Sequence, residues 1–400
     1  MRSLLKPVLA VLCLLSLLLL RAPGTEDVET WRAWMDLLAQ RGLREGFARS
    51  GGIYPPGTFL WLYAVIQGAG LFGVGHFLAL KLSLAFALVL TSAVLWFWTR
   101  DVELALACFL SLALNAVALG YTDAHFAPPL LLSLLALARG QRAASGALLA
   151  AAFLVKWQPL IMLPFFVIWL AADGDRAFGP ALRRIAAFLG GCLAVVALVL
   201  AIFGSALFST LRDALTHAYL SGNALNLNWI YTWLLHVLRP ETYGALASGP
   251  AALRHESLLI ATVDPLLILP QRLLFAACYV YCLIRLARPG ARFADFVRAS
   301  ALGFLAYCML ATGVHENHFF AALLLLALLA GLERASWPLF VAWAIAANLN
   351  LWVFYGLRGR PPRLDAIVGL SVFFAVCNVV LFVASYRSAI GSQRFRAETR

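Results

Sequence analysis

Long apolar segments alternate with short polar ones along almost the whole chain. A helix that crosses a membrane needs about 20 apolar residues, and the chain holds about 12 candidate segments, several of them shorter than that. Short segments separated by polar residues indicate broken or tilted helices around an internal cavity. The candidates are 4–21, 75–98, 103–120, 126–138, 143–155, 157–172, 185–204, 265–286, 297–313, 318–331, 337–356 and 366–386. The pattern predicts an all-α, multi-pass integral membrane protein, with residues 1–400 forming one membrane domain.

Composition argues against two other classes of protein. Of the 400 residues, 63% are apolar and only 12% are charged, whereas soluble globular chains are about half apolar and about a quarter charged. Neither a water-soluble single core nor a disordered chain is therefore expected. The formal net charge of +12 has no soluble basic domain to carry it, so we expect no nucleic-acid partner.

Arginines in the short connections predict the orientation, because Arg-rich loops stay on the cytoplasmic side of a membrane. Of the 31 basic side chains, only Lys6, Lys81 and Lys156 are lysines. If segment 57–73 crossed the membrane, ten later arginines would face outward. If it lies in the outer leaflet instead, all ten face inward: Arg100, Arg139, Arg142, Arg176, Arg183, Arg184, Arg285, Arg288, Arg292 and Arg298. We therefore expect 57–73 to be peripheral, the protein to lie in the plasma membrane, and both termini to be cytoplasmic.

Two segments fit this scheme less simply. Residues 4–20 have the pattern of a cleaved signal peptide or of a first span; the lack of a clean small-x-small site after them favours the uncleaved span. The connection 357–365 falls on the outer side, against the positive-inside rule, although it carries three arginines: Arg358, Arg360 and Arg363.

Most polar residues other than arginine fall in the outer connections. The first connection begins with an acidic cluster that includes Asp27, and apolar residues at helical spacing over 28–43 predict an interfacial amphipathic helix. Tyr54, in the sequence Tyr-Pro-Pro-Gly, is suited to anchoring an extended turn at the headgroup level. Taken alone, the acidic cluster would be interpreted as ordinary solvated charges.

A second carboxylate and two lysines are expected at the same face. Asp123 lies in a tight outer connection, where it either caps the helix that starts near 126 or belongs to a site. Lys156 lies between two short apolar segments, and Lys81 lies near the outer end of the 75–98 span. The positive-inside rule does not favour lysines on the outer side, so we expect both to face an anionic lipid headgroup such as a phosphate.

Two further polar groups complete the candidate site. The segment from Asn226 to Trp229 is suited to sugar hydroxyls and ring faces, and equally to capping a helix at the interface. His315 and Glu316 lie in a short polar connection between two spans. We expect His315 to bind a phosphate or headgroup, because two histidines three residues apart offer no third metal ligand. A metal-free site is favoured over one with a divalent ion.

In this order, the residues resemble those of the GT-C superfamily of glycosyltransferases that use polyprenyl-phosphate sugars, particularly its bacterial mannosyltransferase-like members. The matches run through the whole chain: Asp27 with Trp31 and Trp34, Tyr54-Pro55-Pro56-Gly57, Gly120-Tyr121-Thr122-Asp123, Lys156 with Pro159, Asn226 to Trp229, and His315-Glu316. The family's helix after the Tyr-Pro-Pro-Gly motif is peripheral, as expected here for 57–73. The sequence departs from the family pattern at Ile53, where Asp is frequent, at Tyr121 and Thr122, which replace a Gln, and at Asn317, where Arg is common.

The resemblance implies a GT-C-like fold with interfacial helices in the first outer loop, a catalytic module over 1–204 and variable helices over 205–400. It implies inverting transfer of a mannose-like hexose or a pentose from a polyprenyl-phosphate donor to a hydroxyl of a glycan, glycolipid or protein at the periplasmic or extracellular face. No cofactor beyond the lipid-linked donor is implied. The expected catalytic residues are Asp27 as general base and Asp123 to orient the acceptor or share that role. The expected substrate-binding residues are Lys81, Lys156, His315, Glu316, Tyr54, Asn226 and Trp229.

Two other functions are weighed against this one. A lipid or glycan transporter or flippase would have charged or broken spans at the bilayer midplane in two related halves, and no such halves are visible in the sequence. A non-catalytic subunit of a glycan assembly complex would tolerate substitution of Asp27, Asp123 and Lys156 together.

Overall fold

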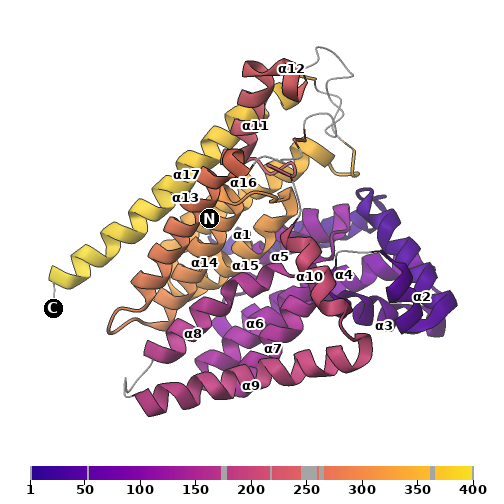
Figure 1. Cartoon of the computed structure of the whole chain (residues 1–400), viewed down its shortest axis with the longest axis horizontal. Helices are drawn as coiled ribbons and strands as arrows, with labels where there is room; N and C mark the ends of the chain where they lie inside the picture. Colours follow the sequence, from indigo (N-terminus) through magenta and orange to yellow (C-terminus); the bar gives the residue numbers. More distant parts are fainter. Residues whose placement is uncertain are drawn as a thin grey trace.

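The computed structural model describes residues 2–51, 54–172, 178–216, 219–244, 259–260, 265–360 and 365–398. The part of the chain so described is all-helical, and isolated β-bridges join Gly222 and Asn223 to His315. Figure 1 shows the helices packed side by side, with α2 and α3 at one edge and α17 at another.

The first half of the chain forms nine helices within the described ranges. They are α1 (Arg2–Ser16), α2 (Asp27–Arg49), α3 (Pro56–Phe72), α4 (His76–Thr99), α5 (Val102–Ala113), α6 (Ala127–Ala138), α7 (Arg142–Val155), α8 (Leu163–Ala172) and α9 (Phe178–Phe203). Short helical turns connect some of them: η1 (Leu17–Arg21), the π-helical segment η2 (Leu114–Leu119), and the 3-10 turns η3 (Thr122–Phe126) and η4 (Gln158–Met162).

The second half of the described chain contributes eight helices. They are α10 (Ala206–Leu215), α11 (Leu227–Leu238), α12 (Pro240–Tyr243), α13 (Pro265–Leu286), α14 (Phe293–Leu310), α15 (Phe319–Leu332), α16 (Trp337–Tyr355) and α17 (Asp365–Glu398), with the 3-10 turns η7 (Glu316–His318) and η8 (Arg334–Ser336). Helices α10, α11 and α12 lie in the connection 205–264, where apolar runs alone predicted no span.

Each apolar segment predicted to span the membrane contains a helix. Seven stretches of the described chain are long and apolar enough to cross a membrane: His76–Thr99, Val102–Leu119, Phe178–Phe203, Pro265–Leu286, Phe293–Leu310, Arg334–Tyr355 and Gly369–Ser388. Four others are apolar but shorter: Thr122–Ala138, Arg142–Val155, Gln158–Ala172 and Glu316–Leu332. The structure is thus that of an all-helical membrane protein, while the count of about 12 crossings stays a prediction.

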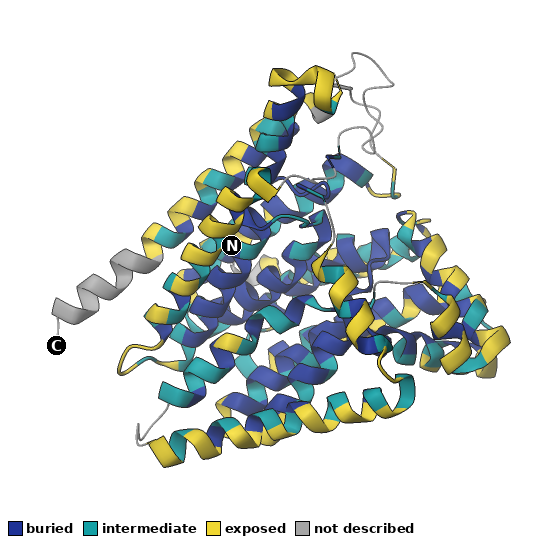
Figure 2. Ribbon diagram, in the orientation of Figure 1, coloured by how far each residue is buried: buried dark blue, intermediate teal, exposed yellow. Residues whose placement is uncertain are grey.

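Burial separates a packed centre from an apolar exterior. Helix α15 is apolar on every side and buried along residues 319–330, so neighbouring helices surround it. By contrast, α9, α13 and α17 present large exposed apolar side chains such as Leu193, Leu273 and Val380, and Figure 2 shows exposed residues along α9 and α17. Exposed apolar helix faces of this kind are suited to contact with lipid.

The predicted interfacial helix is confirmed as a helix in α2, which is interrupted by the non-helical Gly42 (φ 73°, ψ 178°). Aromatic rings join it to α3, with ring centroids 4.7 Å apart between Trp34 and Phe59 and 4.8 Å apart between Phe47 and Phe59. The two helices therefore pack against each other through these rings.

A charged network marks one end of the bundle. Arg298 pairs with Glu333, and Arg292 lies 2.5 Å from the same carboxylate. Arg334 lies 3.3 Å from Asp101. Because α14 rises about 1.5 Å per residue, this network at its start is roughly 27 Å from Glu316, which follows its end. A second polar cluster, which includes Glu316, lies at that opposite end.

Candidate functional site

Four connections at this second end bring together polar residues that are distant in the sequence. Asp27 comes from the start of α2, Asp123 from η3, Lys156 from the junction of α7 and η4, and Glu316 from η7. Lys156 Nζ lies 2.8 Å from Asp123 Oδ1. Asp27 is close enough for the charges of both members of this pair to act on its carboxylate. The structure therefore groups four of the residues singled out from the sequence.

The backbone before Asp123 is shaped by a left-handed glycine. The π-helical segment η2 ends at Gly120, which has φ 80°, and the Tyr121 N–H donates to the Asn115 carbonyl oxygen at 3.2 Å. A side chain at Gly120 would overlap the Val28 side chain, so only glycine fits there. This turn directs the following 3-10 turn, and with it Asp123, into the interior.

Asp123 is a member of the site and not a helix cap. The N-cap position of α6 is held by Phe126 without any side-chain cap hydrogen bond. The two oxygens of the Asp123 carboxylate instead accept from Lys156 Nζ at 2.8 Å and from Asn317 Nδ2 at 3.0 Å. Asp123 is fully buried, so these two donors replace the water that its charge loses.

Lys156 owes its position to the end of α7. The chain leaves the helix there in an extended conformation (φ −153°, ψ 136°), and Pro159 follows within η4. Only 7% of the Lys156 side chain is exposed, and its Nζ lies 5.6 Å from the centroid of the Tyr54 ring. The ammonium group is therefore held between a carboxylate and an aromatic face.

Tyr54 belongs to an aromatic cluster beside Asp27. Its ring centroid is 4.7 Å from that of Trp31 and 5.7 Å from that of Trp34, both in edge-to-face contact. Trp31 lies one helical turn after Asp27 on α2. The sequence motif around Tyr54 thus forms the wall between the interfacial helix and the Asp123–Lys156 pair.

Asp27 differs from the other carboxylates of the site. It is half-buried, and within the described ranges no side chain or backbone donor is hydrogen-bonded to its carboxylate. Burial raises the pKa of Asp27; the Lys156 charge opposes this rise, and the charges of Asp123 and Glu26 add to it. The result is an accessible carboxylate of increased basicity.

Glu316 is buried and hydrogen-bonded to Tyr121. The Tyr121 hydroxyl donates to Glu316 Oε1, and the Glu316 backbone N–H donates to the Gly222 carbonyl oxygen at 3.1 Å. Burial raises the pKa of Glu316 to about 7, against the effect of the Tyr121 hydrogen bond. Its other oxygen, Oε2, has no partner among the described atoms.

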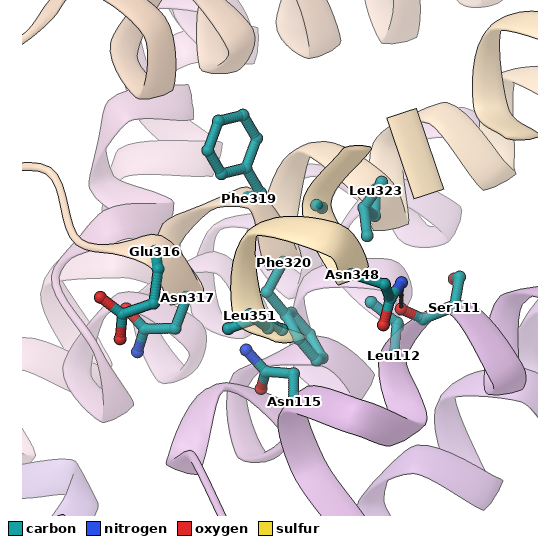
Figure 3. A pocket seen from close by; sticks show the side chains of 11 residues that line it. Ser111, Leu112, Asn115, Glu316, Asn317, Phe319, Phe320, Leu323, Asn348 and Leu351 are labelled. Carbon is teal, nitrogen blue, oxygen red and sulfur yellow. Dashed lines mark hydrogen bonds between the residues drawn. The ribbon is translucent and has the colours of Figure 1, made fainter. Parts of the chain in front are cut away.

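A small cavity lies next to Glu316. In Figure 3, Glu316 and Asn317 lie together at one end of it, and Asn348 and Ser111 lie at the other. The Asn348 amide donates to the Ser111 carbonyl oxygen at 2.8 Å. Between these polar ends the lining is mostly apolar: Leu112, Phe319, Phe320, Leu323, Ala347 and Leu351.

His315 is placed by an adjacent segment and not by the Asp123–Lys156 pair. The backbone of Gly222 and Asn223 bridges to His315, and a side chain at Gly222 would overlap the His315 ring. His315 also faces His318, with ring centroids 5.5 Å apart. Two residues of the outer connections lie outside the described residues: His217, in the connection 205–264 that also holds Gly222, and Arg363, in the connection 357–365.

Two residues expected to bind sugar have internal contacts instead. Asn226 Oδ1 accepts from the Trp229 N–H at 3.0 Å and caps α11, and Asn226 Nδ2 donates to the Cys308 carbonyl oxygen at 2.9 Å. Trp229 Nε1 donates to Ser371 Oγ at 2.9 Å. Both side chains are fully buried, so the capping interpretation, left open by the sequence, describes this segment.

Lys81 is likewise buried and contacts the protein backbone. Its side chain is fully buried, and Nζ donates to the carbonyl oxygens of Val117 and Ala118 at 2.9 and 2.7 Å. These carbonyls belong to η2. The expectation that Lys81 faces a lipid phosphate is therefore replaced by a structural contact to the segment that leads to Asp123.

Sequence reasoning missed several partners in the site. Asn317 was noted only as a departure from the family pattern, yet it donates to Asp123. Tyr121 holds Glu316, and Tyr355, at the end of α16, accepts from Asn223 Nδ2 at 3.3 Å. The available signal was that each of these polar residues borders a long apolar run.

Comparison of the chain with models of known protein families and with curated proteins found no match.

Proposed function

We propose that this protein is an inverting membrane glycosyltransferase that moves a mannose-like hexose or a pentose from a polyprenyl-phosphate donor to an acceptor hydroxyl. The observation that carries the proposal is Asp27: a half-buried carboxylate without a hydrogen-bond partner in the described chain, beside the buried Asp123–Lys156 pair. Asp123 is held by two donors, and Glu316 is buried. Asp27 is thus the carboxylate of the three that an acceptor hydroxyl can best reach.

The reaction balances with the residues of the site. The acceptor oxygen attacks the anomeric carbon from the face opposite the phosphate and forms the new glycosidic bond. The bond from the anomeric carbon to the phosphate oxygen breaks, and its electron pair leaves with the polyprenyl phosphate. The hydroxyl proton passes to Asp27 as general base. Displacement from the opposite face inverts the anomeric centre.

The other residues of the site would hold this geometry. Lys156 would keep Asp123 ionised and fixed, and Asp123 would orient the acceptor hydroxyl. Tyr54, packed against the buried rings of Trp31 and Trp34, is the ring of this cluster suited to contact a sugar. Transfer would take place at the outer face of the plasma membrane, with both termini cytoplasmic. The arginine-rich network at the opposite end of α14 supports this orientation.

The first test is consumption of a donor. Purified protein is incubated with a panel of polyprenyl-phosphate hexoses and pentoses, and loss of each donor and release of polyprenyl phosphate are followed by mass spectrometry. One donor is expected to be consumed in the presence of a hydroxyl acceptor. If no donor is consumed with any acceptor tried, the proposal fails.

The second test is substitution of the base. Asp27→Asn removes the proton acceptor while keeping the size of the side chain, so we expect transfer to fall by at least about 100-fold with donor binding unchanged. Glu29→Gln is the matched control, because Glu29 is an exposed acid on the same helix turn, and it should leave transfer unchanged. Near wild-type transfer by Asp27→Asn would remove Asp27 from the mechanism.

A further inference from the structure

Arg358 and Arg360 lie on the turn that follows α16. Gly356 (φ 55°) and Gly359 (φ 77°) give this turn its shape. A side chain at Gly359 would overlap the carbonyl group of Gly24. The turn thus rests directly on the backbone three residues before Asp27, and the two arginines flank the point of contact.

The segment under this turn leads to two carboxylates of the site, Asp27 and Asp123. The Thr25 N–H donates to the Leu119 carbonyl oxygen at 3.0 Å, and Leu119 lies four residues before Asp123. At the other side of the turn, Tyr355 packs edge-to-face on Tyr121, with ring centroids 6.3 Å apart. The turn is therefore held from two directions against the connections that carry Asp27, Asp123 and Glu316.

The site described so far has no cation that is available to bind a phosphate. Three carboxylates lie near one ammonium, and that ammonium, Lys156, is paired with Asp123. The other buried lysine, Lys81, donates to two backbone carbonyls. A donor phosphate placed here would meet more negative than positive charge, which opposes binding and raises the barrier to departure of an anionic leaving group.

The two arginines carry positive charge that is not paired with any described group, unlike Lys156 and Lys81. Arg358 and Arg360 are exposed, and neither forms a hydrogen bond or ion pair in the described chain. Both lie on the side predicted to face outward, whereas the positive-inside rule favours arginines on the cytoplasmic side. The rule therefore does not explain why arginines occur at these two positions. A guanidinium group presents paired N–H donors that match two phosphate oxygens.

We propose that Arg358 and Arg360 form the phosphate-binding site for the lipid-linked donor, at the membrane surface beside Asp27. The ligand is a phosphate ester whose isoprenoid chain stays in the lipid while its phosphate contacts the turn. This inference rests on the proposed function for the identity of the donor, but binding of the phosphate can be measured without turnover.

The experiment measures equilibrium binding of farnesyl phosphate to the full-length protein in nanodiscs of zwitterionic lipid. We expect the double variant Arg358→Gln/Arg360→Gln to bind at least about tenfold more weakly than the wild type. The variant Arg358→Lys/Arg360→Lys should be intermediate, because it keeps the charge and loses the paired geometry. Arg212→Gln/Arg239→Gln removes the same charge from two exposed arginines of the loop 205–264 and should bind as the wild type does.

The probes separate the sources of phosphate. Inorganic phosphate and phosphatidylglycerol are used as competitors; farnesyl phosphate should be displaced weakly by either. If phosphatidylglycerol competes equally, the turn is a general anionic-lipid surface and the proposal is wrong. Equal affinity of the wild type and the Arg358→Gln/Arg360→Gln variant also overturns it, as does absence of binding by the wild type. By contrast, if the wild type binds farnesyl phosphate through these arginines but consumes no donor, only the proposed function fails.

Discussion

Lys156 Nζ and Asp123 Oδ1 are 2.8 Å apart, with the two side chains 7% and 1% exposed. Removing two charges from water costs several kcal/mol for each ion, and their attraction offsets this only when the geometry is good and the remaining atoms are hydrogen-bonded. Asn317 provides that second hydrogen bond to Asp123. The pair therefore fixes the end of α7 relative to η3, and a change in either member affects the whole site.

Replacing one member of this pair should destabilise the protein more, relative to the number of substitutions, than replacing both. Lys156→Met leaves the Asp123 charge without its cation, and Asp123→Asn leaves the ammonium without its anion, so each should cost about 3–5 kcal/mol. The variant carrying both substitutions buries no unpaired charge and should be less destabilised than the sum of the two. Thermal unfolding of the detergent-solubilised variants measures this coupling. Additive losses of stability would show that the two charges do not depend on each other.

The stability of the protein should depend on the protonation of Glu316. Its pKa is raised from the ordinary 4.5 to about 7 by burial, so between these values the folded state binds a proton that the unfolded state has released. Stability is then greatest at low pH and falls as the pH rises from about 4.5 through about 7. Apparent melting temperatures measured from pH 5 to pH 8 should show this decline.

A neutral substitution isolates the contribution of Glu316. Glu316→Gln cannot ionise, so its melting temperature should vary less over the same range than that of the wild type. Glu29→Gln changes an exposed acid and should follow the wild-type curve. If Glu316→Gln and the wild type have parallel curves, then Glu316 does not titrate in this interval.

Hydropathy and charge were sufficient to predict most of the helices and several residues of the site. Apolar runs located α1, α4 to α9 and α13 to α17, because a helix in lipid must satisfy its own backbone hydrogen bonds, but they did not predict α10, α11 or α12. Polar residues that interrupt such runs, such as Asp123 and Lys156, were singled out because they are costly to bury. That principle identifies which residues matter without identifying their partners.

Partners depended on tertiary packing that the sequence does not contain. Asn317 and Asp123 are separated by 194 positions and Lys156 and Asp123 by 33, so no local pattern could pair them. The same limitation explains Asn226, whose composition was suited equally to sugar binding and to capping. The Asn226 amide donates to the Cys308 carbonyl oxygen because of where α11 lies relative to α14.

The role of Lys81 can be tested directly, because the sequence predicted that it binds a phosphate and the structure shows it bound to the backbone of η2. Within the fold its ammonium holds the carbonyls of Val117 and Ala118, and the segment that contains them leads to Asp123. Lys81→Met should therefore disturb the placement of Asp123 and reduce the rate of transfer by about 10- to 100-fold, while the affinity for farnesyl phosphate stays unchanged. Lys6→Met, which removes the lysine predicted near the cytoplasmic face, is the control and should change neither quantity. Weaker farnesyl phosphate binding by Lys81→Met, with a normal rate at saturation, would instead restore the phosphate-binding role that the sequence predicted.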